Sequence, residues 1–202
     1  MKRAARWEWA LLIALLVSFA WGTWADRTQQ QLSDKVLRLH VLANSDSEAD
    51  QALKLKVRDS VLEAASAILA DCPDRETAEQ RLSAALPEIE DAARARIAAE
   101  GETQTVTAEL RPTRFPTREY EDFSLPAGDY LALRVVLGEG EGHNWWCVVF
   151  PPLCAETTSS LSQTAMAAGL TEEEVALITE SDGYQLKFKA VELWEKLMAY
   201  FR

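Results

Sequence analysis

The chain has 202 residues, of which 48% are hydrophobic and 26% are charged, a composition that excludes a disordered chain and leaves room for one globular domain with a short appendage. Its 21 basic and 32 acidic side chains give a formal net charge of −11, which repels phosphate backbones and anionic lipid surfaces. We therefore expect no nucleic-acid partner.

The first 25 residues have the pattern of an export signal. Three basic residues come first, at Lys2, Arg3 and Arg6. Residues 9–21 follow without a charge, and small residues come after them. This uncharged run is shorter than the roughly 20 apolar residues that a transmembrane helix needs. We predict a signal peptide or membrane anchor at 1–25 and one exported domain at 26–202, with membrane contact only through the first segment if it is not cleaved.

The exported part begins with a strand. Residues 26–35 are polar and predict a linker or the first turn of a helix. Residues 36–42 are rich in branched apolar side chains that alternate along the chain, which indicates a strand. His40 lies on the side away from the leucines, so we expect it at a surface or an interface.

A long helix should follow this strand. Ser47 and Asp50 have the spacing of a capping box and predict a helix that runs to about residue 70. On this helix, Lys54 and Arg58 are expected to point to water. A second helical stretch covers roughly 75–99 and must kink or split at Pro87.

The remaining segments alternate between strands and helices. Strands are predicted at 103–110 (interrupted by Pro112), at 130–137 and at 145–150. The last two are joined by the short connection 138–144, which favours an antiparallel pair. A helix should start at Thr171, and an amphipathic helix should cover 187–201. The predicted class is α+β, with a small, mainly antiparallel sheet packed by helices after the N-terminal signal or anchor helix.

Two cysteines bracket a short, proline-stiffened segment. Cys147 and Cys154 can form a disulfide in an oxidising compartment, which would leave Cys72 over. Other pairings, or no bond, remain alternatives. With His143, the same two cysteines can also be read as zinc ligands or as a cysteine nucleophile with its base, but the spacing matches no common zinc pattern. We predict no catalytic residue, no metal and no cofactor.

Two further polar segments have simple structural explanations. The glycines at 138, 140 and 142 alternate with glutamates, which predicts a flexible acidic turn and not a phosphate-binding loop. Asn44 and Asp46 can bind a ligand, or they can belong to the cap between strand and helix. Trp145 and Trp146 are adjacent on a strand and must point to opposite faces, and an exposed tryptophan is a common binding anchor.

Several long blocks resemble one family. They are Leu37–Ser47, Asp50–Asp59, Leu125–Tyr130, Leu133–Gly140, Asn144–Cys147, Phe150–Cys154 and Lys187–Trp194. Their order and rare composition are similar to the stage II sporulation protein R family across almost the whole exported part. The stretch 75–100 carries little of this resemblance, and 155–180 carries less.

The resemblance implies an intercellular signal. Proteins of that family are made in the forespore and exported to the space between the two sporulation membranes. There they trigger a membrane-embedded aspartic protease of the mother cell, which cleaves the precursor of sigma factor E. This chain would then be an activating ligand and not an enzyme. Its candidate partner-binding residues are Trp145, Trp146, His143, Asn144, Asn44 and Asp46.

The alternative is an exported hydrolase that acts on the cell wall. Such an enzyme would need paired carboxylates or a metal centre in a cleft. Asp46, Asp50 and Glu141 are the acids that could serve.

Overall fold

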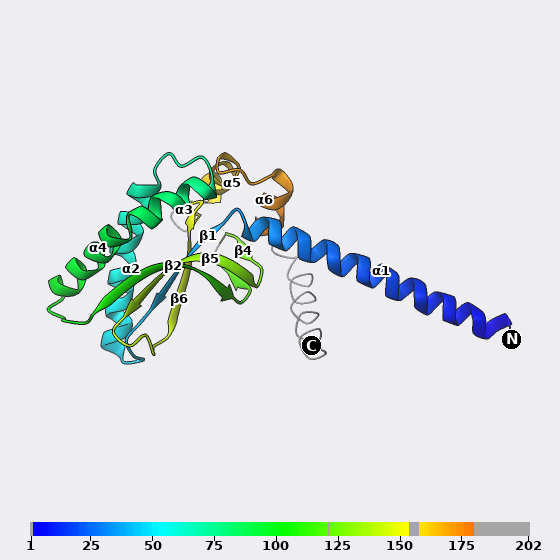
Figure 1. The fold of residues 1–202 in the computed structure, drawn as a ribbon, viewed down its shortest axis with the longest axis horizontal. Coiled ribbons are helices and arrows are strands. Elements are labelled where there is room, and N and C mark those ends of the chain that lie inside the picture. Colours follow the sequence, from blue (N-terminus) through cyan, green and yellow to red (C-terminus); the bar gives the residue numbers. More distant parts are fainter. Residues whose placement is uncertain (1, 121, 154–157, 180–202) are drawn as a thin grey trace.

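The computed structural model describes residues 2–120, 122–153 and 158–179. Cys154 and the amphipathic helix predicted at 187–201 lie outside the described residues. The elements are α1 (Lys2–Ser33), β1 (Leu37–Leu42), α2 (Glu48–Leu69), α3 (Arg75–Ala84), α4 (Leu86–Ala99), β2 (Val106–Phe115), β3 (Arg118–Glu119), β4 (Ser124–Leu125), β5 (Gly128–Leu137), β6 (Asn144–Phe150), α5 (Thr158–Ala167) and α6 (Glu172–Thr179) (Figure 1).

A four-stranded sheet forms the centre, in the order β2-β5-β1-β6. β1 runs parallel to β5 and antiparallel to β6, and β2 runs antiparallel to β5. The α+β class is confirmed, but the prediction of a mainly antiparallel sheet is not, because the sheet is mixed. The prediction that β5 and β6 pair is wrong, since β1 lies between them. Neighbouring strands are about 4.8 Å apart, so β5 and β6, which lie on either side of β1, are about 10 Å apart. The short loop 138–143 is long enough to join them past the end of β1.

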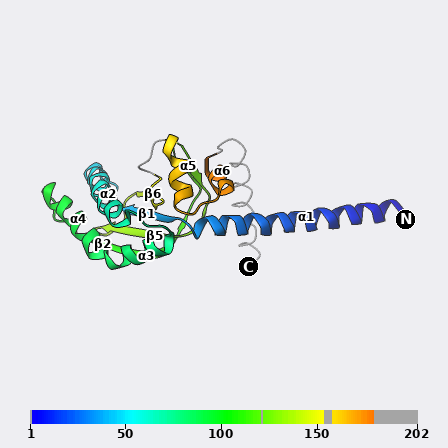
Figure 2. The same cartoon turned by 90° about the horizontal axis from the view of Figure 1, so that it is seen from above.

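The two faces of the sheet are covered by different elements. α2, α3 and α4 pack on one face over Leu39 and Val135, in what we call the first core. The end of α1, the β3–β4 hairpin, α5 and α6 cover the other face over Tyr130 and Val148, in the second core. Figure 2 shows α5 and α6 together, away from α2 and α4. β1 is therefore buried along both faces.

Helix ends follow the local signals in the sequence. Ser47 caps α2 by accepting a hydrogen bond from the Asp50 N–H at 3.1 Å, as predicted. The predicted split at Pro87 is also confirmed, because this proline lies in the first turn of α4, where its missing N–H costs nothing. Thr171 and Glu174 form a reciprocal capping box at the start of α6, with bonds of 3.2 and 2.7 Å.

β2 is longer than predicted. It continues through Pro112 to Phe115, whereas the sequence predicted an interruption at the proline. β2 pairs only with β5 and is an edge strand of the sheet. A proline is tolerated on an edge strand because the missing N–H need not serve a second neighbour.

His40 is not at the surface, as the sequence suggested, but is buried on β1. The rings of Phe115 and Trp146 each lie 5.9 Å from its ring, centroid to centroid. Strand alternation placed His40 on the correct face, but it could not reveal that the second core covers this face.

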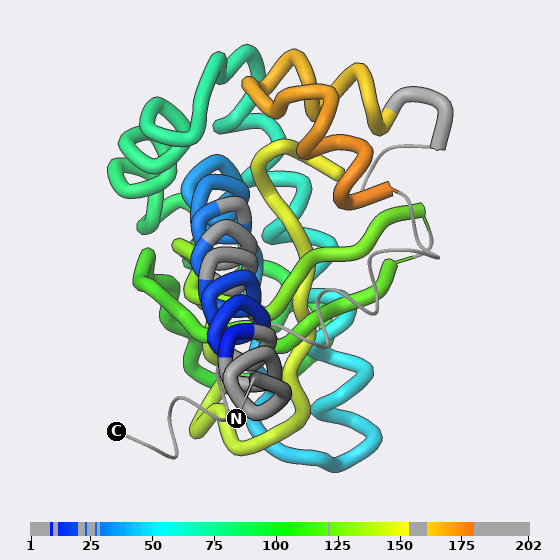
Figure 3. The backbone as a smooth tube through the Cα atoms, turned by 90° about the vertical axis from the view of Figure 1, so that its right-hand side faces the viewer, coloured from blue at the N-terminus to red at the C-terminus, as the bar shows by residue number. Residues whose placement is uncertain are grey.

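α1 extends away from the rest of the molecule as one continuous helix that includes residues 26–33 (Figure 1). Figure 3 shows this helix nearly end-on. Large apolar side chains are exposed along its first twenty residues, at Trp9, Leu12, Ile13, Leu15, Leu16, Val17 and Phe19, whereas Leu32 near its end is buried in the second core. None of the helices described has both the length and the apolar content required to cross a membrane. The signal or anchor at 1–25 stays a prediction.

Candidate functional site

Two loops that are far apart in sequence meet at one end of the sheet. The first loop, residues 43–47, joins β1 to α2, and the second, residues 138–143, joins β5 to β6. The Gly142 N–H donates to the Ala43 carbonyl at 2.9 Å, and the Glu141 N–H donates to the Asn44 carbonyl at 3.2 Å. We call these two loops and the first turns of α2 the loop corner. The predicted acidic turn is therefore fixed to the chain that follows β1.

Asn44 links the two loops through its side chain. Its Oδ1 accepts a hydrogen bond from the Glu139 N–H at 3.0 Å, and its Nδ2 donates to Asp50 Oδ2 at 3.0 Å. The helix cap is made by Ser47 and not by Asn44. Asn44 thus holds the corner together from both sides.

Asp50 is the centre of the hydrogen-bond network. Oδ2 accepts from Asn44 and from the Ser45 hydroxyl at 2.5 Å, while Oδ1 accepts from Gln104 Nε2 at 2.5 Å. These hydrogen bonds hold the pKa of the Asp50 carboxyl below its ordinary value, and the bond from Ser45 has the largest effect. The sequence showed Asp50 as part of a cap and as one acid of a possible hydrolase, but not as the centre of a hydrogen-bond network. Its contact with Gln104 depends on the packing of a segment more than fifty residues away.

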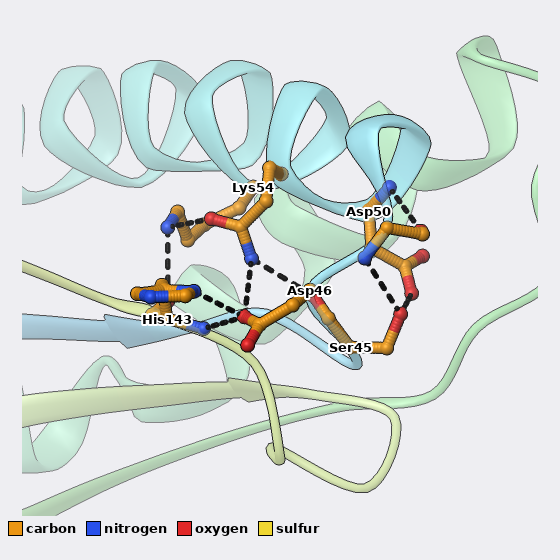
Figure 4. Close-up of polar contacts among 7 residues, drawn as sticks. Ser45, Asp46, Asp50, Lys54 and His143 are labelled. Atoms are coloured by element: carbon orange, nitrogen blue, oxygen red, sulfur yellow. Dashed lines mark hydrogen bonds and ion pairs between the residues drawn. The ribbon is translucent and has the colours of Figure 1, made fainter.

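Asp46 and His143 form a pair on the outside of the corner (Figure 4). Oδ1 of Asp46 accepts the His143 backbone N–H at 2.6 Å and also contacts the ring Nδ1. The two side chains are 56% and 76% exposed. The hydrogen bond from His143 holds the pKa of Asp46 below its ordinary value. This pair presents a fixed polar group to solvent.

Lys54 corrects a prediction, because it does not point to water. Its side chain is buried, with only 4% of the residue exposed, and Nζ donates to the His143 carbonyl at 2.9 Å and to Gln51 Oε1 at 2.5 Å (Figure 4). Burial lowers its pKa. The sequence did contain a signal: Lys54 lies four residues after Asp50 and three before Val57, on the buried face of α2.

Trp145 stands beside the corner on β6. It is 37% exposed, and Arg58 of α2 lies over its ring, with Cζ 4.3 Å from the centroid. Arg58 was also predicted to point to water, but it is half-buried by this contact. A guanidinium stacked on an indole is stabilised by the ring quadrupole. The stacking holds Trp145 in one orientation at the surface.

The structure therefore divides the six predicted partner-binding residues into two groups. Asn44, Asp46 and His143 meet in the loop corner, with Trp145 next to them. Asn144 and Trp146 belong to the opposite face of the sheet. There Asn144 Oδ1 lies 2.6 Å from His40 Nε2, and Trp146 packs against the second core.

The geometry of the corner disfavours the catalytic alternatives. Cys147 is buried in the first core, whereas the His143 ring is exposed, so the two do not form a nucleophile and base. A glycosidase acid needs a raised pKa, but the pKa values of Asp46 and Asp50 are both lowered. Within the described part of the chain, no group of three or more His, Cys, Asp or Glu side chains is placed to hold a metal.

The cysteines are placed as follows. Cys72 is a free thiol whose pKa is raised by burial. Cys147 is buried on β6. Because Cys154 lies outside the described residues, the disulfide between Cys147 and Cys154 stays a prediction.

The fold and the loop corner define a small α+β protein with a mixed four-stranded sheet and an exposed polar corner whose two loops are hydrogen-bonded to each other. The family model for stage II sporulation protein R matches residues 33–160, so the chain belongs to that family. This confirms the resemblance seen in the sequence, and the matched range contains the corner and the six strands that the structure describes.

A relative in Bacillus subtilis supports the same assignment. The stage II sporulation protein R of strain 168 is 39% identical to this chain over 147 residues. The match covers 71% of this chain and 66% of the relative, just under two thirds of the relative's length. No solved structure matches the chain. The family membership places the chain among sporulation proteins.

Proposed function

We propose that this chain is a secreted sporulation signal that activates a membrane aspartic protease of the mother cell and so leads to processing of the sigma factor E precursor. The observation that carries the proposal is the family match, which spans the whole sheet and the loop corner. In this role the chain is a ligand of the protease and not itself an enzyme. The protease supplies the chemistry, and the chain supplies binding energy.

The docking surface that we propose consists of Trp145, Arg58, Asp46 and His143. Tryptophan and arginine are the residues most enriched at the energetic centres of interfaces. Arg58 already orients the Trp145 ring at 4.3 Å, and Asp46 and His143 already hold each other. Fixing these side chains before contact reduces the conformational entropy that binding would otherwise cost.

Activation requires a difference in affinity. A ligand shifts its partner toward the active arrangement only by as much as it binds that arrangement more tightly than the inactive one. A rigid corner suits this task, because a flexible surface would adapt to both arrangements. We therefore assign discrimination to the corner and anchoring to Trp145.

Export to the space between the two sporulation membranes is part of the proposal. The apolar side chains exposed along α1, such as Leu15 and Phe19, have no described protein partner, which is the property expected of a signal or anchor that engages membrane. In that oxidising compartment we propose the disulfide between Cys147 and Cys154.

Replacing Trp145 by alanine tests the proposed docking surface. Membranes carrying the protease and the sigma factor E precursor are mixed with the full chain, and precursor cleavage is followed. We expect Trp145→Ala to weaken activation by about tenfold or more, corresponding to about 1.4 kcal/mol of lost binding, while the circular dichroism spectrum is unchanged. Trp146→Ala is unsuitable because it also removes part of the second core.

Met166→Ala is the matched control. Met166 is a large apolar residue on α5 that is 41% exposed and lies away from the corner. This variant should activate as the unchanged chain does. Equal losses in both variants would contradict the docking surface. Cleavage that proceeds without the chain would overturn the signalling function and direct the search to cell-wall substrates.

The disulfide has its own test. We expect chain isolated from an oxidising compartment to yield one cross-linked peptide containing Cys147 and Cys154, while Cys72 reacts with an alkylating reagent. Mass spectrometry before and after reduction measures this. Recovery of alkylated Cys147 from unreduced protein would exclude the bond.

A further inference from the structure

The second face of the sheet buries an arginine. Arg38 of β1 has an exposed fraction of 0% and is one of the largest fully buried side chains. Its Cζ lies 4.0 Å from the centroid of the Phe115 ring and 5.0 Å from that of Tyr130. Burial lowers the pKa of this guanidinium, which shows how unfavourable the surroundings are for an unpaired charge.

The hydrogen-bonding capacity of Arg38 is mostly unused. Nη2 donates to the Tyr120 hydroxyl at 2.6 Å, but Nε and Nη1 are buried without a partner. No carboxylate in the described part of the chain forms an ion pair with this guanidinium. A buried arginine normally has a carboxylate or several carbonyls around it, because a buried and uncompensated charge destabilises a fold by several kcal/mol. Each forked edge of the guanidinium keeps a free N–H.

A second unused donor lies next to this arginine. The indole Nε1 of Trp146 is buried and has no partner. The Trp146 and Phe115 rings are 6.1 Å apart, and Phe115 is the same ring over which Arg38 lies. Arg118, from the β3–β4 hairpin, stacks on the Trp146 ring, with Cζ 3.9 Å from the ring centroid. Two guanidinium groups and an indole N–H thus converge on one aromatic cluster.

The nearby Arg134 has the carboxylate partner that Arg38 lacks among the described residues. It lies two strands' width from Trp146 on β5 and is paired with Glu109 at 2.9 Å. His40 lies between Arg38 and Arg134 in this cluster; its Nε2 contacts Asn144, its Nδ1 is buried and unpartnered, and its pKa is lowered by burial. The positive charge of Arg38 therefore has no described negative counterpart, while the half-buried arginine beside it has one.

We propose that Arg38 is the centre of a binding site for a carboxylate, which enters beneath the β3–β4 hairpin and displaces the Tyr120 hydroxyl from Nη2. A carboxylate fits because it is planar, carries one charge to match one unpaired arginine, and forms paired hydrogen bonds with a forked edge of the guanidinium. A phosphate dianion would bring a second negative charge into the cluster, where Arg38 is the buried cation and the Arg118 side chain is exposed to water. The hairpin can yield because each of its strands has only two residues. This site lies on the opposite face of the sheet from the loop corner and does not depend on the proposed partner.

The test uses the full chain in mild detergent, labelled with ¹⁵N-arginine, and formate as the probe. We expect formate, added into the millimolar range against chloride at equal ionic strength, to shift the Arg38 Nε resonance saturably and to raise the melting temperature. Both effects should be lost in Arg38→Met and kept in the matched variant Arg134→Met. Formate effects that equal those of chloride, or that persist in Arg38→Met, overturn the site.

Two further arms complete the test. Should Arg38→Met fail to fold, Tyr120→Phe keeps the charge of Arg38 and frees its Nη2, so this variant should bind formate several-fold more tightly. Unchanged or weaker binding overturns the proposal.

A capped peptide with one glutamate, compared with its glutamine version, identifies the source of the carboxylate. Binding of formate and of the glutamate peptide assigns the site to an acidic side chain of a polypeptide. Binding of formate alone assigns it to a small free acid.

Discussion

Replacing Gly142 by alanine should lower the free energy of unfolding by about 3 kcal/mol, because the added methyl group has no space. A Cβ on Gly142 would overlap the backbone carbonyl of Ser45 and would lie 2.9 Å from the Ala43 Cβ. The backbone cannot easily move aside, since the Gly142 N–H donates to the Ala43 carbonyl at 2.9 Å. Urea unfolding followed by circular dichroism measures the loss.

Gly101 provides the matched control for this substitution. Gly101 has a φ of +78°, and no atom lies within 4 Å of the position that an added methyl group would take, so Gly101→Ala should cost only the strain of a left-handed backbone, about 1 kcal/mol. Gly142 is the reverse case: its backbone conformation suits any residue, and the whole cost is steric. Equal losses in the two variants would show that the loops are not packed as closely as the structure has them.

The same substitution links the fold to the proposed function. Gly142 precedes His143, whose backbone N–H and ring both contact Asp46. If the loops separate, the pair on the outside of the corner separates as well. Activation of the protease by Gly142→Ala should therefore fall even at a temperature where the variant remains folded.

Elements that depend on neighbouring residues were predictable from the sequence. Ser47 caps a helix because its hydroxyl meets the N–H three residues later, and Pro87 starts a helix because its φ is fixed. Both effects act within one turn of the chain. The alternation of apolar residues in β1 also identified this strand without any knowledge of its partners.

The order of the strands and the composition of the site were not predictable in this way. The insertion of β1 between β5 and β6 depends on contacts between segments about a hundred residues apart, such as His40 with Trp146. The burial of Arg38 depends on the hairpin that covers it, and the burial of Lys54 depends on the loop after β5. Asn44, Asp46 and His143 were candidates individually, but only the structure brings them together.

Asp50→Asn should lower the free energy of unfolding by about 2–3 kcal/mol at neutral pH. The carboxylate accepts hydrogen bonds from Asn44, Ser45 and Gln104. An asparagine keeps one acceptor oxygen and turns an NH₂ group toward at least one of these donors. The change also removes a negative charge from the first turn of α2, where the helix dipole favours it.

Glu63→Gln is the control in the same helix, since Glu63 is exposed on α2 and should change stability by no more than about 0.5 kcal/mol. A loss of similar size in both variants would show that the effect is general charge and not the Asp50 network.

The difference between the unchanged chain and Asp50→Asn should depend on pH in a defined direction. The pKa of Asp50 is lower in the folded chain than the ordinary value of about 3.9 for an unfolded aspartate. A group of this kind contributes its full stability above the unfolded pKa and loses that stability as the pH falls through the folded pKa. The gap between the two proteins should therefore be constant at neutral pH and should narrow in acid, as measured by urea unfolding at a series of pH values. A gap that stays constant in acid would mean that the charge of Asp50 contributes nothing, and that the network is held by shape alone.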